Sequence, residues 1–164
     1  MTMEHTPGLP WFWSVIAASE RRLSLLARQL EKMSRNELLE YASEYEEAKS
    51  EINPYSFEDP IWPSDGFSED SADDFTAWVV SLGDSMYDRL REEPTRIHEF
   101  YALFEESRNG VGLNRWDKTV DRPEYRGWQS ATGLAVAIYE IRFGRTFHKD
   151  LTAYEKGKRR SSVP

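Results

Sequence analysis

The chain carries its densest group of carboxylates in one short stretch, at Glu69, Asp70, Asp73 and Asp74. Neighbouring carboxylates can bind a hard divalent cation, or divide the roles of general acid and general base between them. Adjacent residues of a helix point in different directions, however, which weakens a site shared by Asp73 and Asp74. Acidic side chains in a first helical turn are also what the helix dipole favours. The pattern therefore favours helix stabilisation over a metal or catalytic site.

His98 completes the only acid–base combination that the sequence offers, together with Asp73 and Asp74. An acid–base or metal-dependent enzyme that uses these three residues is the alternative hypothesis. The histidines lack the spacing of a zinc motif, there is no glycine-rich phosphate loop, and no serine has the context of a nucleophile elbow. Because the chain has no cysteine, thiol catalysis and thiolate metal sites are excluded. We therefore expect no metal and no cofactor, and the pattern leans away from an enzyme.

A helix over residues 71–90 would position these acids, and it is the centre of the predicted core. Its apolar side chains recur at steps of three and four, which places them on one side of the helix. Ser71 is the predicted N-terminal cap, and Gly83 predicts a kink or a stop, with Asp84 or Ser85 capping a continuation. The core-facing residues are Phe75, Trp78, Val79, Leu82, Met86 and Leu90.

The N-terminal part of the chain predicts a helix from Pro10 to Met33 with one apolar seam. The seam fits either the chain's own core, which is the commoner arrangement, or a second copy, which would make a homodimer. Two shorter helices that break between Ser19 and Ser24 fit the pattern almost as well. The seam consists of Phe12, Ile16, Leu23, Leu26, Leu30 and Met33.

Ser34 and Glu37 form a capping box, which predicts the start of the next helix. This helix ends before Pro54, since proline cannot continue it. Its predicted inward residues are Leu38, Ala42, Tyr45, Ala48 and Ile52. Its predicted outer stripe, exposed to solvent, is Glu40, Glu44, Glu47 and Glu51.

Two irregular connections, residues 53–70 and 107–122, separate the predicted helices. Connections of this length are usually functional or are tied down by their own side chains. The first either covers the edge of the core as a lid or binds a partner, and a small hairpin also fits the second. The candidate partner-binding residues are Tyr55, Phe57, Trp62, Asp65 and Trp116.

Two further helices complete the pattern. Pro94 starts one of them, and Asp121 with Glu124 caps the last helix, which Gly144 ends. Beyond Asp150 the chain becomes polar and then basic, and we expect it to fray. The predicted inward residues of the two helices are Ile97, Phe100, Tyr101, Phe104, Trp128, Ala131, Leu134, Ala135, Ile138 and Ile141.

The length, charge and composition of the chain limit which classes of protein it fits. The 164 residues suit one domain, predicted over residues 10–150, with an N-terminal tail at 1–9 and a polar to basic tail at 151–164. The formal charge of −8 disfavours nucleic acid and attracts a basic protein partner, although the same charge also serves solubility alone. Since the chain has no membrane-spanning apolar run and no signal-peptide pattern at its start, we expect a cytoplasmic protein without membrane contact.

Three short motifs follow one another along the chain. They are Phe12-Trp13-Ser14-Val15-Ile16; the Ser34 cap followed by Glu37-Leu38-Leu39; and Asp73-Asp74-Phe75 with Trp78, Ser81 and Gly83, followed by Pro94. This order resembles a bacterial domain-of-unknown-function family, number 4240, over about residues 11–104. One departure is Pro60-Ile61-Trp62-Pro63-Ser64, where the family has an apolar segment rich in small residues. The resemblance implies a mainly helical fold, and it transfers no catalytic residue because the family carries no established activity.

Taken together, the residues predict an all-α fold, a single compact domain of about five to six helices with two long irregular connections. The favoured function is that of an acidic protein-interaction module, adaptor or immunity-like, which acts on a basic partner through its aromatic and acidic loops.

Overall fold

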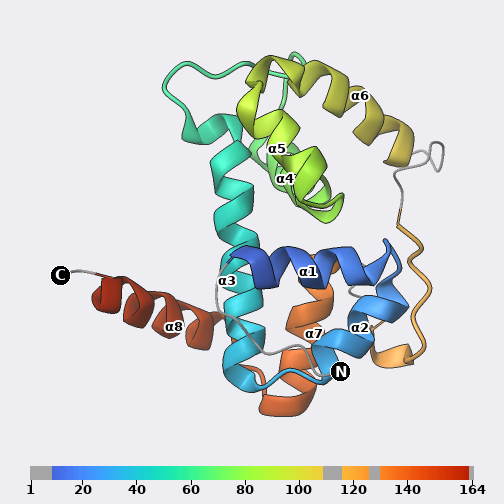
Figure 1. Cartoon of the computed structure of the whole chain (residues 1–164), viewed down its shortest axis with the longest axis vertical. Coiled ribbons are helices and arrows are strands. Elements are labelled where there is room, and N and C mark those ends of the chain that lie inside the picture. Colours follow the sequence, from blue (N-terminus) through green and yellow to red (C-terminus); the bar gives the residue numbers. More distant parts are fainter. Residues whose placement is uncertain (1–8, 109–115, 126–129, 163–164) are drawn as a thin grey trace. The chain divides into compact units, whose positions relative to one another are not determined.

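The computed structural model describes residues 9–108, 116–125 and 130–162, and all regular elements within them are helical (Figure 1). The all-α prediction is therefore confirmed. The number of helices is corrected from five or six to eight α-helices in these residues, because two predicted helices are each broken and the C-terminal segment is helical too. The α-helices are α1 (Leu9–Ser19), α2 (Leu23–Glu31), α3 (Arg35–Ile52), α4 (Glu69–Ser81), α5 (Asp84–Glu92), α6 (Ile97–Arg108), α7 (Ala131–Phe143) and α8 (Phe147–Ser162). Three short 3-10 turns are η1 (Pro54–Ser56), η2 (Pro94–Arg96) and η3 (Pro123–Tyr125).

Packing divides the chain into two compact units. Unit 1 comprises Met1–Tyr45 with Lys118–Pro164, and unit 2 comprises Glu46–Asp117. Helix α3 contributes its first part to unit 1 and its last part to unit 2. That residues 10–150 form one domain, flanked by tails, stays a prediction.

In unit 1, a break separates α1 from α2, so the two-helix alternative for the N-terminal seam is the right one. Glu20 and Arg21 both adopt positive φ angles, 52° and 55°, which reverse the chain direction at a conformation uncommon for residues other than glycine. The side-chain amide of Gln29 in α2 donates a hydrogen bond to the carbonyl of Val15 in α1 (3.1 Å). This bond joins the two helices after the break.

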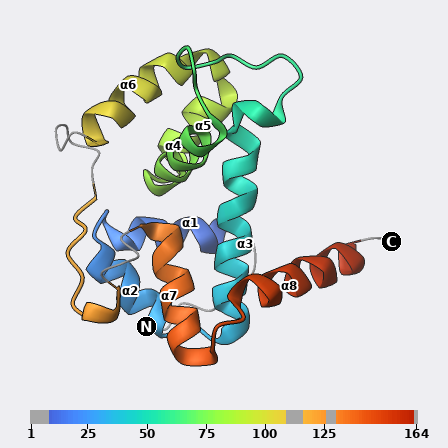
Figure 2. The ribbon, with the colours of Figure 1, turned by 180° about the vertical axis from the view of Figure 1, so that it is seen from behind.

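The seam residues of α1 and α2 are buried within unit 1, where α2 also packs against α7 (Figure 2). Phe12 packs against two tyrosines of α3, with its ring centroid 5.6 Å from those of both Tyr41 and Tyr45. The Tyr41 hydroxyl donates to the carbonyl of Ala131 in α7 (3.1 Å), so its polar end is satisfied inside the core. Fully buried core residues of unit 1 include Phe12, Leu26, Leu30, Leu38, Leu134 and Tyr139.

The capping box that starts α3 is confirmed. The Glu37 amide donates to the Ser34 hydroxyl, and the Ser34 amide donates to the Glu37 carboxylate, both at 3.1 Å. The predicted outer stripe of α3 is wrong in its first half, since Glu40 and Glu44 are buried. Glu44 is paired within unit 1, since the Lys158 ammonium of α8 lies 3.8 Å from its carboxylate.

Helix α8 also corrects the prediction of a frayed end beyond Asp150. The Asp150 carboxylate accepts hydrogen bonds from the hydroxyls of Tyr139 and Thr146, both at 2.6 Å, and pairs with Arg35 at 3.3 Å. These contacts and the ion pair of Lys158 hold the segment as a regular helix. The prediction of fraying rested on the few apolar residues in this segment, whereas hydrogen bonds, ion pairs and the buried ring of Phe147 hold α8 in place.

Helix α7 begins later than predicted. Ser130 is its cap and accepts a hydrogen bond from the Gly133 amide (2.9 Å), whereas Asp121 precedes only the short turn η3 and pairs with Arg28 (3.4 Å). Gly144 ends α7 as predicted, at φ 97°. Ile141 is 48% exposed, so its inward assignment is wrong. Trp128 lies outside the described residues.

In unit 2, the predicted 71–90 helix is divided into α4 and α5. Gly83 makes the break at φ +102°, a conformation that favours glycine, and Asp84 begins the continuation. The predicted cap at Ser71 is wrong, because Ser68 caps α4 and accepts a hydrogen bond from the Ser71 amide (3.0 Å). The prediction was three residues late since Glu69 and Asp70 already belong to the first turn.

Phe75 is the centre of an aromatic core in unit 2. This fully buried ring lies 5.6 Å from both Tyr101 and Phe104 of α6, and 6.3 Å from Trp78 one turn further along α4. Phe67, which precedes α4, contacts Phe75 at 6.2 Å between ring centroids. The predicted inward face of α4 is therefore confirmed where it meets α6, with Trp78 only half-buried.

Candidate interaction site on unit 2

A pocket of about 320 Å³ opens on unit 2, where the end of α3, the following loop, the end of α5 and the start of α6 meet. Ile52, Leu90 and Ile97 are buried and supply its aliphatic floor, and Phe57 and Ile61 are exposed at its rim. The full lining is Glu51, Ile52, Pro54, Phe57, Asp59, Ile61, Leu90, Arg91, Pro94, Thr95 and Ile97.

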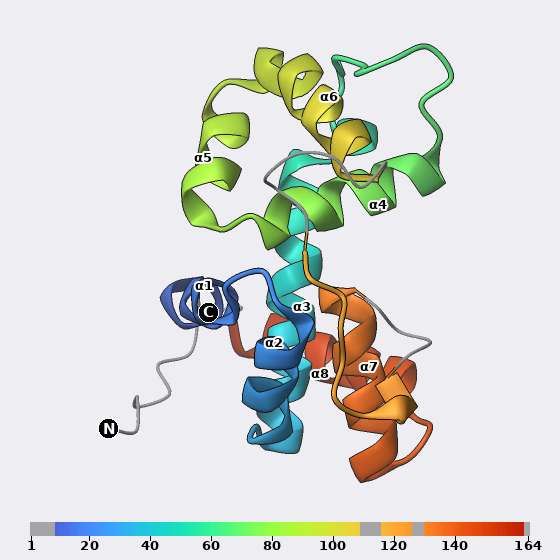
Figure 3. The same cartoon turned by 90° about the vertical axis from the view of Figure 1, so that its right-hand side faces the viewer.

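The loop after α3 is tied to unit 2 from its inner side. Asn53 starts the turn η1 by accepting a hydrogen bond from the Tyr55 amide (3.0 Å), and the Tyr55 hydroxyl donates to the carbonyl of Phe67. Trp62 packs on Tyr55 with ring centroids 4.8 Å apart. Together with buried Pro63, these contacts fix a loop that projects from the helices of unit 2 (Figures 1 and 3).

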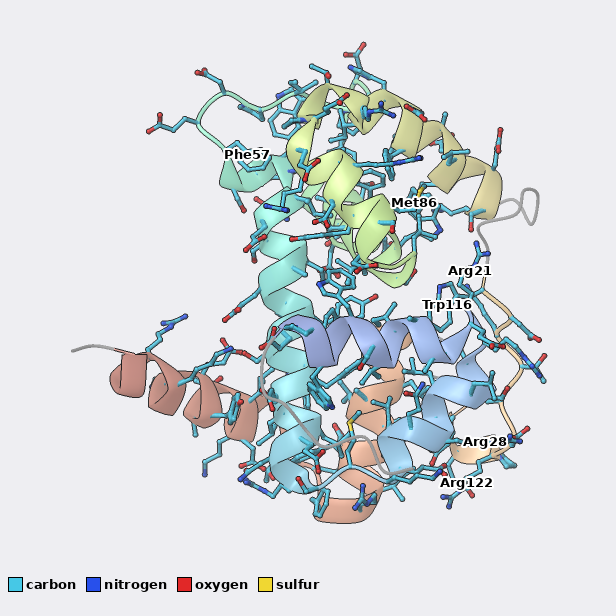
Figure 4. The ribbon with its side chains drawn as sticks, viewed as in Figure 1. Arg21, Arg28, Phe57, Met86, Trp116 and Arg122 are labelled. Atoms are coloured by element: carbon cyan, nitrogen blue, oxygen red, sulfur yellow. The ribbon has the colours of Figure 1, made fainter. Side chains whose placement is uncertain are left out.

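The outer side of the same loop is exposed. Among the described residues, six large apolar side chains are exposed, and four of them belong to this loop: Tyr55 (43%), Phe57 (42%), Ile61 (36%) and Trp62 (41%). Figure 4 shows Phe57 on the loop that follows α3. The inner contacts fit the predicted lid, and a role of this loop in binding a partner stays a prediction. The inner side covers the core, and the outer side presents aromatic surface.

Two contacts of one phenol, one buried and one half-buried, join two walls of the pocket. The Tyr87 hydroxyl of α5 contacts two oxygens of α3, the Ala48 carbonyl (3.0 Å) and the Glu51 carboxylate (2.8 Å). Burial, and next the hydrogen bond to Glu51, raise the pKa of Tyr87 well above its ordinary value, so it stays a protonated donor. This contact positions Leu90, one turn further along α5, against the end of α3.

Charged groups surround the pocket unevenly. Glu51 and Asp59 bring carboxylates to the lining, and Arg91 is its one cation among the described residues. The Arg91 guanidinium contacts Asp88 at 3.1 Å, and this hydrogen bond, with the charge of Asp88, raises the pKa of Arg91. Over the residues of unit 2, 18 Asp and Glu face six Lys and Arg, a formal charge of −12, whereas the rest of the chain carries +4. The acidity of the protein therefore resides in unit 2.

The predicted acid–base residues lie on α4 and α6. Asp73, Asp74 and His98 are all exposed, and no hydrogen bond or ion pair among the described residues joins His98 to either aspartate. Asp73 instead accepts a hydrogen bond from the ammonium of buried Lys49. No group of three or more His, Asp or Glu side chains within the described ranges could hold a metal ion.

Of the predicted partner-binding residues, one lines the pocket and two lie beside it. Phe57 is in the lining, while Tyr55 and Trp62 pack together on the same loop. Asp65 is exposed further along the loop. Trp116 is half-buried, and its indole N–H makes no hydrogen bond to another described residue.

The pocket itself was not found by sequence reasoning. Ile61 is exposed between Pro60 and Trp62. An isoleucine in a proline-rich connection is the one sequence feature that could have indicated a binding surface there. The floor comes from Leu90 and Ile97, whose helical spacing indicates only that they face inward. Their meeting with the end of α3 is a tertiary contact that no local pattern carries.

In the residues that the structure describes, fold and site together define a helical protein with a solvent-accessible, largely apolar pocket on its acidic unit. The family model described as Protein of unknown function (DUF4240) matches residues 11–125, and the chain belongs to this family. The match extends beyond the range 11–104 over which the sequence motifs carried the resemblance. No curated protein and no solved structure matches the chain. In the described part of the chain, no helix is both long enough and apolar enough to cross a membrane.

Proposed function

We propose that this protein is a protein-interaction module, and that unit 2 binds a basic partner protein through the pocket and the aromatic loop beside it. The observation that supports this most is the clustering of Tyr55, Phe57, Ile61 and Trp62 on one exposed loop. Contiguous exposed apolar side chains are unusual on a protein without a partner, and aromatic residues are enriched in interfaces.

The charge of unit 2 selects the kind of partner. A formal charge of −12 over residues 46–117 attracts positively charged surfaces over distances up to about the Debye length, roughly 8 Å at physiological salt. The same field repels nucleic acid and other acidic molecules. A basic partner protein therefore complements the negative charge of unit 2 while it contacts the apolar loop. Binding of such a partner is what an adaptor or an immunity-type protein requires.

Affinity capture from the source cells, with the full chain as bait, tests this proposal. The parent chain, a Phe57→Ala/Ile61→Ala variant and an Ile141→Ala/Phe143→Ala variant are compared side by side. The control pair is also exposed, but it belongs to α7 in unit 1. The proposal predicts a basic protein that is retained by the parent and the control, lost with Phe57→Ala/Ile61→Ala and released by salt. Identical recovery with all three baits contradicts it.

A further inference from the structure

We infer that the pocket on unit 2 takes one apolar side chain of a short linear segment in which Lys or Arg flank that residue. This inference rests on the proposed function, and it names the chemistry that the partner must present. Three observations support it: the shape and composition of the floor, the polarity of the rim, and the ion pair made by Arg91, the one cation among the described residues of the lining.

The floor suits an aliphatic or aromatic side chain. Ile52, Leu90 and Ile97 are each at most 4% exposed, and Pro54 and Pro94 add further apolar surface without a backbone donor. The volume of about 320 Å³ lies at the small end of ligand pockets, which span roughly 300–1,000 Å³. A pocket of this size admits a single large side chain, such as Leu, Met or Phe, rather than the surface of a folded domain.

The rim favours positive charge beside that side chain. Two helices end at the pocket, α3 at Ile52 and α5 at Glu92, and their terminal carbonyl groups bring partial negative charge, while the amino end of α6 at Ile97 brings a partial positive charge. The carboxylates of Glu51 and Asp59 add full negative charges to the same rim. A cation within reach of these groups is stabilised, whereas a carboxylate is repelled.

Arg91 does not reverse this preference. Two nitrogens of its guanidinium, Nε and Nη2, contact the same oxygen of Asp88, at 3.3 and 3.1 Å. Its charge is therefore matched within α5, where the two residues are three apart. A segment with an apolar residue between Lys or Arg fits the pocket and its rim at once, and this is the class of ligand that we assign to the site.

Titration of the isotope-labelled full chain with three synthetic peptides tests the assignment by NMR. The peptides are Lys-Lys-Leu-Lys-Lys, Lys-Lys-Gly-Lys-Lys and Gly-Gly-Leu-Gly-Gly, all with blocked ends. We expect the first peptide to bind at least tenfold more tightly than either of the others, and to shift the methyl resonances of Ile52, Leu90 and Ile97. Equal affinity for the first two peptides contradicts the proposal that an apolar side chain enters the pocket. Equal affinity for the first and third peptides contradicts the role of the flanking positive charges.

A pocket-filling variant separates this inference from the proposed function. Thr95 is exposed and lines the pocket, so Thr95→Trp should fill it without disturbing the floor, while Ala102→Trp places the same side chain at an exposed position of α6 outside the lining. We expect Thr95→Trp to remove the preference for leucine and Ala102→Trp to retain it. If Thr95→Trp leaves both peptide binding and its leucine preference unchanged, the pocket is not the anchor site, although a basic partner could still bind unit 2. If neither lysine-containing peptide binds at low salt, the proposed function fails as well.

Discussion

The hydroxyl of Tyr87 in α5 donates a hydrogen bond to the carboxylate of Glu51 in α3 at 2.8 Å, and it also lies 3.0 Å from the Ala48 carbonyl. The Tyr87 hydroxyl makes both contacts, and Tyr87 is 4% exposed. Because Glu51 and Leu90 line the pocket, this phenol sets the distance between two of its walls. The site thus depends on a half-buried hydrogen bond whose acceptor belongs to the pocket lining.

Removing that hydroxyl should destabilise unit 2. Tyr87→Phe removes the hydrogen bond to the Glu51 carboxylate, and a hydrogen bond to a charged group contributes about 1.5–3 kcal/mol. We expect a loss of that size in the free energy of unfolding, measured by urea titration. Tyr101→Phe is the matched control, because the Tyr101 hydroxyl makes no hydrogen bond to another described residue. A loss for Tyr101→Phe as large as that for Tyr87→Phe would contradict the assignment.

The ion pair between Lys49 and Asp73 should respond asymmetrically to mutation. The Lys49 side chain is 8% exposed, whereas Asp73 is 68% exposed. Asp73→Ala leaves a buried ammonium with only Glu46 (3.3 Å) beside it, and we expect a loss of about 1 kcal/mol or more. Lys49→Met returns two exposed carboxylates to water and keeps the apolar stem, so the loss should stay below about 1 kcal/mol. Equal losses in thermal unfolding would show that the desolvation of Lys49 is unimportant.

Two Gly→Ala substitutions should change the free energy of unfolding in opposite directions. Gly83 lies at φ +102°, ψ 170°, where an L-residue is strained, so Gly83→Ala should destabilise the protein by about 1–3 kcal/mol. Gly157 is within α8, and an added Cβ there meets nothing within 4 Å. Gly157→Ala should therefore stabilise α8 by about 0.5–1 kcal/mol, since alanine is the better helix former. Calorimetric melting of both variants measures this, and a destabilised Gly157→Ala would argue against a regular α8.

Alkaline pH should remove the contribution that the protonated Tyr125 hydroxyl makes to the stability of the fold. Burial, and next the hydrogen bond to Glu31, raise the pKa of Tyr125 from 10.0 to about 12. The folded chain thus holds this proton more tightly than the unfolded chain, so the contribution is fully present below about pH 10 and is lost as the pH rises towards 12. The difference in Tm between the parent and Tyr125→Phe should narrow over this range. A difference that stays constant with pH would show that the Tyr125 proton is not linked to folding.

Local patterns predicted those features that local chemistry determines. The Ser34–Glu37 capping box, the stop at Gly83 and the inward position of Phe75 each depend on a few residues close in sequence, and each is confirmed. The cap of α4 was misplaced because several neighbouring serines and acids satisfy the same rule. Ser68 and Ser71 are equally good acceptors by type, and only the path of the preceding loop decides between them.

Features that depend on distant segments were missed. Glu44 fits a solvated stripe by its spacing, yet it is buried and pairs with Lys158, 114 positions later. The pocket likewise needs Ile52, Ile61 and Ile97 from three separate elements, and no periodicity links them. For the same reason, sequence reasoning identified Phe57 and Trp62 as binding candidates without identifying the cavity that Phe57 borders.

Site-specific photo-crosslinking in the source cells tests most directly whether unit 2 is the binding surface. A photoreactive phenylalanine analogue is placed at position 57, on the pocket rim, and in a separate chain at position 143, at the end of α7. Both native side chains are exposed phenylalanines, at 42% and 38%, so the two probes differ chiefly in the unit that they report on. Position 57 should crosslink to one basic protein, through a segment that contains an apolar residue between Lys or Arg, and position 143 should not. Crosslinking of that protein only from position 143, or no adduct at position 57, would contradict the role of unit 2.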